Sequence, residues 1–186
     1  GALLVYRGRS ADEIRDIHAV RHDGKAWGTP RPVHVDGWKM PACPVNGPDV
    51  AALGEAVVAG WYTEAAGTPE VRLAASRDAG DTFAPPLVLD SGEAVLGRVA
   101  LALDARQAWV LWQRGDGGGQ SLWLSRRSPD LATEYERIEV AKPKGRGRAT
   151  GCPQPAVVDD AAYVVWTAGG DGTTHLTGAA SYTHLP

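Results

Sequence analysis

The sequence predicts an all-β protein built from repeated four-stranded units, and three observations support this prediction. First, the 186 residues include 23 Gly, 13 Pro and 7 Trp but one Phe and one Met, which is typical of short strands joined by turns. Second, four short apolar runs each end in an aromatic residue, at positions 6, 61, 112 and 166. Third, these positions are separated by 55, 51 and 54 residues, which indicates an internal repeat.

Each repeat contains up to four runs in a constant order. The aromatic-ended run is followed by a second run, then by a third, and after a longer loop by a fourth that leads into the next repeat. The second runs are 15–21, 70–76, 120–126 and 173–181, the third are 30–35, 85–90 and 135–140, and the fourth are 48–53, 99–104 and 155–159. All are short and bounded by Gly, Pro, Asp or Asn, so they predict strands. Segments 10–17 and 129–136 are expected to be loops or single helical turns.

Four strands in about 50 residues match one blade of a β-propeller. We therefore expect a single partial propeller with blade repeats of roughly 1–47, 48–98, 99–154 and 155–186. This amounts to fourteen strands, or three and a half blades, so further blades are expected from a longer chain or a second piece. An all-β sandwich is the alternative, although a sandwich gives no reason for the same order of strands to recur.

Composition excludes several classes of protein. Nineteen basic and 22 acidic residues give a net charge of −3, which argues against a nucleic-acid-binding face. No apolar run approaches the roughly 20 residues of a membrane span, and residues 1–9 lack the pattern of a signal peptide. Two cysteines are too few for a four-cysteine zinc site, and the histidines lack ligand spacing. We expect neither a metal nor a cofactor.

The most specific local pattern lies in residues 76–83, where Ser76, Asp78, Gly80, Thr82 and Phe83 form S-x-D-x-G-x-T-F. Asp78 can accept hydrogen bonds from backbone N–H groups in its own turn, Gly80 suits a positive φ, and Phe83 can plug the turn from beneath. A degraded copy occupies residues 21–27, and residues 125–128 occupy the equivalent place in the third repeat without the acid. We interpret the pattern as structural.

This pattern resembles the Asp-box of the sialidase β-propeller superfamily, and the resemblance covers nearly the whole chain. It is closest to bacterial sialidase-like proteins, in the segments 6–7, 15–17 and 36–48. The resemblance implies a six-bladed propeller whose Asp-boxes lie opposite the ligand site. The loops 7–14, 63–69, 113–119 and 167–172, with 36–47, 91–98 and 141–154, are then expected on the functional face.

Sialidases hold a sugar carboxylate with three converging arginines, since a guanidinium offers paired donors to a carboxylate. By placement, the resemblance nominates Arg7, Arg98 and Arg148 as ligand-binding residues. The basic loop that contains Arg148 could equally be a solvated surface loop. Trp38 lies in the long loop 36–47, where its ring could stack on a sugar or pack against the loop.

Retaining hydrolysis needs a nucleophile and a general acid, which in sialidases are a Tyr activated by Glu and an Asp. Asp16 and Asp36 are weak candidates for the acid, and each could be an ordinary loop carboxylate. Tyr62 and Glu64 are close in the sequence, but their spacing does not establish a catalytic pair. The catalytic set is therefore unknown at this level.

Cys43 and Cys152 both precede proline and are 109 residues apart, or two blades. A disulfide between them would join two long loops and indicate an oxidising compartment, hence a periplasmic or secreted protein. Two separate thiols are the alternative.

The sequence thus predicts a sialidase-like propeller that binds an anionic glycan or small acid at the channel mouth, and that could be a retaining, exo-acting glycoside hydrolase. The alternative is a non-catalytic propeller that binds a protein or a polysaccharide.

Overall fold

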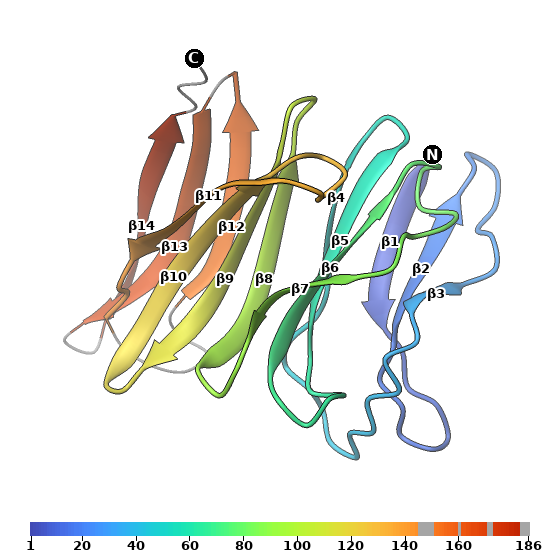
Figure 1. Ribbon diagram of the computed structural model, residues 1–186, viewed down its shortest axis with the longest axis horizontal. Helices are drawn as coiled ribbons and strands as arrows, with labels where there is room; N and C mark the ends of the chain where they lie inside the picture. Colours follow the sequence, from blue (N-terminus) through green and yellow to red (C-terminus); the bar gives the residue numbers. More distant parts are fainter. Residues whose placement is uncertain (145–150, 160, 171–172, 183–186) are drawn as a thin grey trace.

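The computed structural model describes all residues except 145–150, 160, 171–172 and 183–186. The described residues form strands, turns and loops and contain no helix, so none of them lies in a helix that could cross a membrane. In Figure 1 the strands form four sheets that stand side by side. The first sheet contains β1 (Ala2–Arg7), β2 (Ile17–His22) and β3 (Arg31–His34).

The next two sheets each contain four strands. The second comprises β4 (Asp49–Leu53), β5 (Ala56–Thr63), β6 (Glu70–Ser76) and β7 (Leu87–Ser91). The third comprises β8 (Val95–Leu103), β9 (Ala108–Asp116), β10 (Gly119–Arg127) and β11 (Glu134–Ala141). The last sheet contains β12 (Gly151–Val158), β13 (Ala161–Gly170) and β14 (Thr173–Tyr182). Pairing is antiparallel throughout, and neighbours in each sheet are consecutive in the chain.

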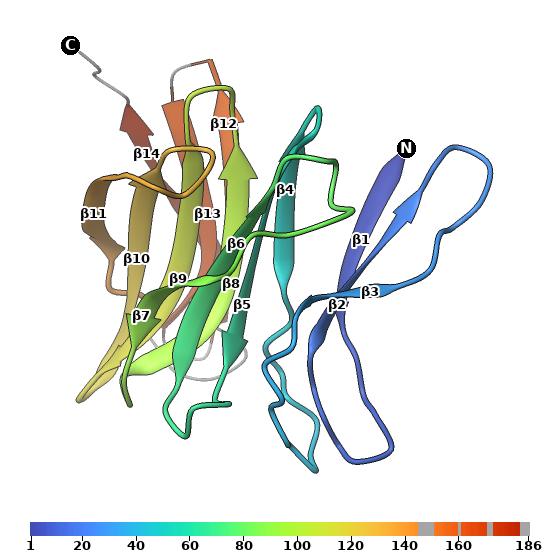
Figure 2. The same cartoon turned by 45° about the vertical axis from the view of Figure 1, so that its right-hand side comes forward.

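The first strands of the last three sheets lie next to one another. β8 contacts both β4 and β12, and it also packs on β5 of the preceding sheet. β4 in turn contacts β1, just as β8 contacts β5. β1 therefore corresponds to β5, the second strand of a blade. The sheets therefore fan out from adjacent inner strands, which is the arrangement of propeller blades (Figure 2). The fourteen strands of the described residues agree with the fourteen expected from the sequence.

Each space between neighbouring sheets is filled by one apolar core that contains a repeated tryptophan. Trp61 lies between the first and second sheets, Trp112 between the second and third, and Trp166 between the third and fourth. All three rings are buried, and they occupy equivalent positions in β5, β9 and β13. Inter-blade packing thus explains the period of the aromatic residues.

A polar bond accompanies this packing at Trp112. The indole Nε1 donates a hydrogen bond of 2.6 Å to Asp90 at the end of β7, and Arg114 pairs with the same carboxylate at 2.6 Å. The tryptophan of one sheet is thereby tied to the last strand of the sheet before it. The same arrangement recurs one sheet earlier around Trp61 and is described with the site.

The turn between β6 and β7 is organised by Asp78. Its carboxylate accepts hydrogen bonds from the Thr82 backbone N–H at 2.9 Å, from the Thr82 hydroxyl at 2.6 Å and from the Ser76 hydroxyl at 2.7 Å. Gly80 has φ of 87°, where its lack of Cβ is needed. Phe83 packs against the core around Trp61. Hydrogen bonding, chiefly from Thr82, lowers the pKa of Asp78 to about 2.

The lowered pKa of Asp78 makes the turn sensitive to acid. In an unfolded chain an aspartate titrates near 3.9, so the contribution of Asp78 is complete above that pH and is lost as pH falls through about 2. We expect Asp78→Ala to lower the free energy of unfolding by about 1 kcal/mol at pH 7. In urea denaturation the difference from wild type should shrink toward pH 2. The control is Asp12→Ala, at an exposed loop carboxylate. It should change neither the free energy of unfolding at pH 7 nor the dependence of that free energy on pH.

The structure corrects the expectation that the third repeat has lost its acid. In the β10–β11 turn the Asp130 carboxylate accepts hydrogen bonds from the Ser128 hydroxyl at 2.6 Å and from the Ala132 N–H at 3.1 Å. Ser128 and Asp130 have the same i, i+2 relation as Ser76 and Asp78. Asp130 lies two residues beyond the segment 125–128, because the turn of the third repeat begins at Ser128.

Candidate functional site

The β3–β4 and β7–β8 loops, which join consecutive sheets, lie at the same end of the molecule as the loops between the second and third strands of the blades. In Figures 1 and 2 this end is at the bottom and carries the β1–β2, β3–β4, β5–β6, β7–β8 and β9–β10 connections. The β2–β3, β6–β7 and β10–β11 turns lie at the opposite end. Arg7, Trp38 and Cys43 lie near or within the loops of the lower end, where the resemblance places the ligand site.

Two inner strands enter this end through the same unusual backbone geometry. In β8, Gly97 and Arg98 have φ of 77° and 52°, and in β12, Gly151 and Cys152 have φ of 82° and 52°. The register of pairing shifts at both places, as in a β-bulge. A left-handed conformation is uncommon for a residue with a Cβ and clusters at functional sites. The bulges present the Arg98 and Cys152 side chains side by side.

Arg98 and Cys152 line a cavity of about 230 Å³ between the inner strands β4, β8 and β12. The Arg98 guanidinium donates to the Cys152 Sγ at 3.1 Å. Asn46 fixes the bulge, because its Oδ1 accepts from the Arg98 N–H at 3.2 Å and its Nδ2 donates to the Leu96 carbonyl at 3.1 Å. Among the described residues no carboxylate pairs with Arg98, so its cationic group is available to a ligand. We call this space the Arg98 cavity.

Asp49, the first residue of β4, supplies the carboxylate of the Arg98 cavity. Its Oδ2 accepts a hydrogen bond from the Leu101 N–H at 2.7 Å. Burial raises the pKa of this carboxyl despite that bond. A carboxyl group that retains its proton more readily than usual is suited to act as a general acid.

Arg7 lies at the end of β1, and its guanidinium is occupied by the protein itself. It donates to the backbone carbonyls of Arg15, Asn46 and Tyr62 at 2.8, 3.2 and 2.6 Å. Burial lowers the pKa of Arg7 to about 10, which leaves it charged at pH 7. Arg7 therefore ties three chain segments together, and binding a ligand would require these bonds to be replaced.

Trp38 is only 5% exposed, which corrects the expectation that it could stack on a sugar. The Arg7 guanidinium lies 5.0 Å from the centre of its ring, and Tyr62 meets it edge to face at 5.9 Å. Instead of packing against its own loop, which was the alternative left open by the sequence, Trp38 belongs to the core that contains Trp112.

Asp36 and Asp16, the two candidate acids, both hold structural bonds. Asp36 is 1% exposed in its side chain and accepts from Trp61 Nε1 at 2.7 Å and from Arg72 at 2.7 Å. This is the arrangement seen around Trp112, one sheet earlier. Asp16 is buried, and its Oδ1 accepts from the Gly37 N–H at 2.8 Å. Neither residue lines the Arg98 cavity.

Tyr62 and Glu64 are hydrogen-bonded to one another, a contact that the sequence alone did not establish. Burial, with the bond to Glu64 adding to it, raises the pKa of the Tyr62 hydroxyl above its usual range. A phenol acting as a nucleophile needs a lowered pKa or a base that takes its proton. Glu64 accepts the hydrogen bond of the hydroxyl and is placed to take its proton, whereas burial opposes ionisation, so the contact by itself does not assign Tyr62 as a nucleophile.

Instead of the disulfide considered from the sequence, the structure has two free cysteines, Cys43 and Cys152, both with exposed side chains. Cys152 contacts Arg98, and Cys43 lies in the β3–β4 loop. Arg148 falls outside the described residues. The described residues contain no group of three or more His, Cys, Asp or Glu placed to hold a metal ion.

Sequence reasoning missed Asn46 and Asp49, which complete the Arg98 cavity. A signal for the cavity was nevertheless present in the sequence. A glycine followed by a polar residue occurs near the start of two equivalent inner strands, 54 residues apart, as Gly97-Arg98 and Gly151-Cys152. The glycines permit the positive φ from which each bulge begins. The role of Asn46 depends on a contact across 52 residues and has no local pattern.

The four fanned antiparallel sheets and the cavity between their inner strands define an all-β protein of the β-propeller class. No protein family and no curated protein matches the sequence. The chain is similar in structure to an endo-arabinase from Bacteroides thetaiotaomicron VPI-5482, with a TM-score of 0.58 and 16% identity over 97% of this chain and 71% of that one. It is also similar to a xylan beta-1,4-xylosidase from Bacillus halodurans C-125, with a TM-score of 0.52 and 14% identity over 99% of this chain and 38% of that one. At these identities the similarity shows the fold.

Proposed function

We propose that the chain belongs to a carbohydrate-active β-propeller that binds an anionic glycan or a small acid in the Arg98 cavity. The observation that carries the proposal is the Arg98 guanidinium, which a strained bulge presents beside Cys152 without a carboxylate partner among the described residues. Such a cation at a concave site is suited to a carboxylate, to which it can donate two parallel hydrogen bonds. The similar proteins named as an arabinase and a xylosidase support a carbohydrate as the wider ligand class.

The finer part of the proposal is a sialidase-like, six-bladed propeller, with its remaining blades supplied outside these residues. Its support is the turn at Asp78, with its S-x-D-x-G-x-T-F pattern and the plug formed by Phe83. Of the three arginines nominated from the resemblance, Arg98 is the one that the cavity favours. Arg7 is held by backbone carbonyls, and Arg148 lies outside the described residues.

Glycoside hydrolysis is proposed with Asp49 as the general acid, because Asp49 lines the cavity and its pKa is raised. A non-catalytic binding module is the second candidate. It is favoured by the structural bonds of Asp16 and Asp36, the two acids nominated from the sequence, and by the absence of an assigned nucleophile among the residues that line the cavity. Turnover of a fluorogenic sialoside separates the two: Asp49→Asn should abolish turnover by a hydrolase while preserving binding, whereas a binding module shows no turnover at all.

Arg98→Ala is expected to weaken binding of a sialyl-oligosaccharide by about ten- to a hundredfold, because each hydrogen bond to a charged group contributes about 1.5–3 kcal/mol. Isothermal titration of the protein measures this. The matched control is Arg9→Ala, which removes an exposed arginine at the same end of the molecule but outside the cavity. Unchanged affinity in Arg98→Ala, with the protein folded, would contradict the proposed site.

A further inference from the structure

Trp27 is an exposed aromatic residue at a position where the next repeat has a partly buried one. The segments 21–27 and 76–83 occupy equivalent turns, in which Trp27 and Phe83 are the aromatic end points. Phe83 packs into the core around Trp61. Trp27 is instead 55% exposed, although its turn is well held: the Asp23 carboxylate accepts from the backbone N–H groups of residues 25 and 26 at 2.8 and 2.9 Å.

The indole of Trp27 forms one wall of a crevice of about 230 Å³. The crevice lies between the β2–β3 hairpin and the β6–β7 turn, and its polar lining consists of Arg21, Asp23, Thr29, Arg31 and Asp81. An edge-to-face contact with His22, at 5.1 Å between ring centres, fixes the orientation of the indole. The volume is below the roughly 300–1,000 Å³ of sites for drug-sized ligands, so it suits a single ring.

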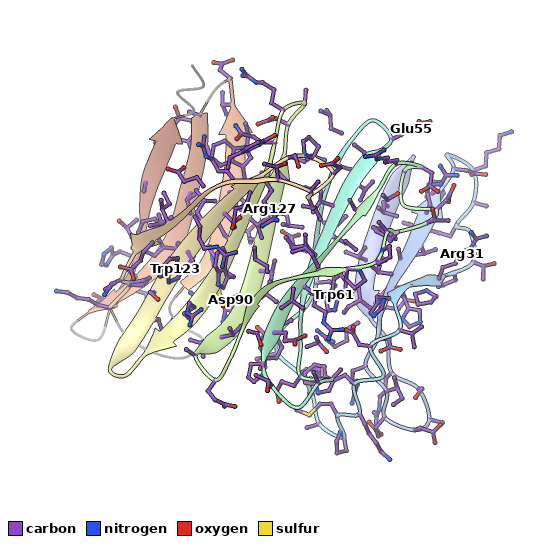
Figure 3. The ribbon with its side chains drawn as sticks, in the orientation of Figure 1. Arg31, Glu55, Trp61, Asp90, Trp123 and Arg127 are labelled. Atoms are coloured by element: carbon purple, nitrogen blue, oxygen red, sulfur yellow. The ribbon has the colours of Figure 1, made fainter. Side chains whose placement is uncertain are left out.

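The charged groups of the crevice balance one another. Arg21 and Asp81 form an ion pair of 2.8 Å across the two sheets, and both side chains are partly exposed. Arg31 is exposed at the rim, at the outer edge of the first sheet (Figure 3). With two arginines and two aspartates, the crevice does not favour an anion in the way that the Arg98 cavity does. It offers both donors and acceptors to hydroxyl groups.

We propose that this crevice is a second binding site, for one ring of a neutral glycan, with the sugar on the indole of Trp27 and its hydroxyls bonded to Arg31 and to the Arg21–Asp81 pair. An indole offers a large apolar surface with little conformational freedom to lose, and the surrounding charges satisfy the polar rim of a sugar. The site is at the opposite end of the molecule from the Arg98 cavity (Figure 1). It would therefore hold a polysaccharide chain independently of the ligand at the Arg98 cavity.

Affinity electrophoresis of the protein in gels containing soluble arabinan or xylan tests the proposal. We expect wild type to be retarded by at least one of these neutral polysaccharides, and Trp27→Ala to bind at least about tenfold more weakly. Tyr163→Ala is the matched control, because it removes an aromatic side chain that is 44% exposed elsewhere on the surface. Arg98→Ala should remain as retarded as wild type, which separates this site from the proposed anion site.

Absence of retardation of the wild type by both polysaccharides would overturn the proposal, as would retardation of a folded Trp27→Ala that equals wild type. Circular dichroism shows whether that variant is folded. Arg31→Ala provides a second test, because the exposed Arg31 side chain is not needed for the core. Its retardation should fall several-fold, and an unchanged value would assign the binding to another surface.

Discussion

Trp112→Ala is expected to lower the free energy of unfolding by about 3–5 kcal/mol, the range observed for removing a large aromatic side chain from a core. Trp112 is fully buried between the second and third sheets. Its removal leaves a cavity and deprives the Asp90 carboxylate of the 2.6 Å bond from Nε1. The Arg137 guanidinium, 5.3 Å from the ring, also loses its contact.

Urea denaturation followed by circular dichroism measures this change. Trp112→Phe retains most of the apolar area but not the hydrogen bond to Asp90, so its loss should be smaller, about 1–3 kcal/mol. Trp27→Ala is the matched control, because Trp27 is mostly exposed and should change stability by less than about 1 kcal/mol. A loss below about 1 kcal/mol for Trp112→Ala would mean that the sheets do not depend on this packing.

Asp36→Ala is expected to lower the free energy of unfolding by about 3 kcal/mol, because it removes one partner of a buried ion pair. The Trp61 indole N–H and the Arg72 guanidinium would both lose their acceptor. Glu70, which lies 2.7 Å from Arg72, remains as a second partner and keeps the effect at the lower end of the range for such pairs. Because the Asp36 side chain is buried, salt should screen the contribution only weakly.

The same residue discriminates between a structural role and a catalytic one. Asp36→Asn preserves the shape of the side chain and an acceptor for Trp61, so stability should fall less than in Asp36→Ala. If Asp36 were the general acid, Asp36→Asn would abolish turnover of a fluorogenic sialoside with stability nearly unchanged. We expect Asp36 to be structural. Turnover of the sialoside by Asp36→Asn should then fall only in proportion to the fraction of folded protein.

The order of strands was predictable because it depends on local chemistry. Short apolar runs bounded by Gly, Pro and Asp favour strands through local propensity, and the separations of Trp61, Trp112 and Trp166 are those of the blades. The Asp78 turn was predictable for the same reason, since its hydrogen bonds join residues no more than four apart.

The candidate site was less predictable. Arg7 has the residue type and the position at a strand end that a ligand-binding arginine would have. Its guanidinium is nevertheless occupied by backbone carbonyls, which lie up to 55 residues away in the sequence. Trp38 is likewise a residue type that often stacks on sugar rings, but Arg7 and Tyr62 cover its ring. Whether a polar or aromatic side chain is free for a ligand depends on which distant groups contact it, and sequence spacing does not contain that information.

The sequence by itself determined that this protein is all-β and that its units repeat about every 50 residues, each with an aromatic residue at the same place. Only the tertiary structure decided that Arg98, Asp49 and Asn46 share one cavity while Arg7, Asp16 and Asp36 serve the framework. The physical reason is the separation in sequence between the groups that interact. Strands and turns follow from neighbours in the chain, whereas burial and pairing of a side chain follow from strands that fold onto it from elsewhere.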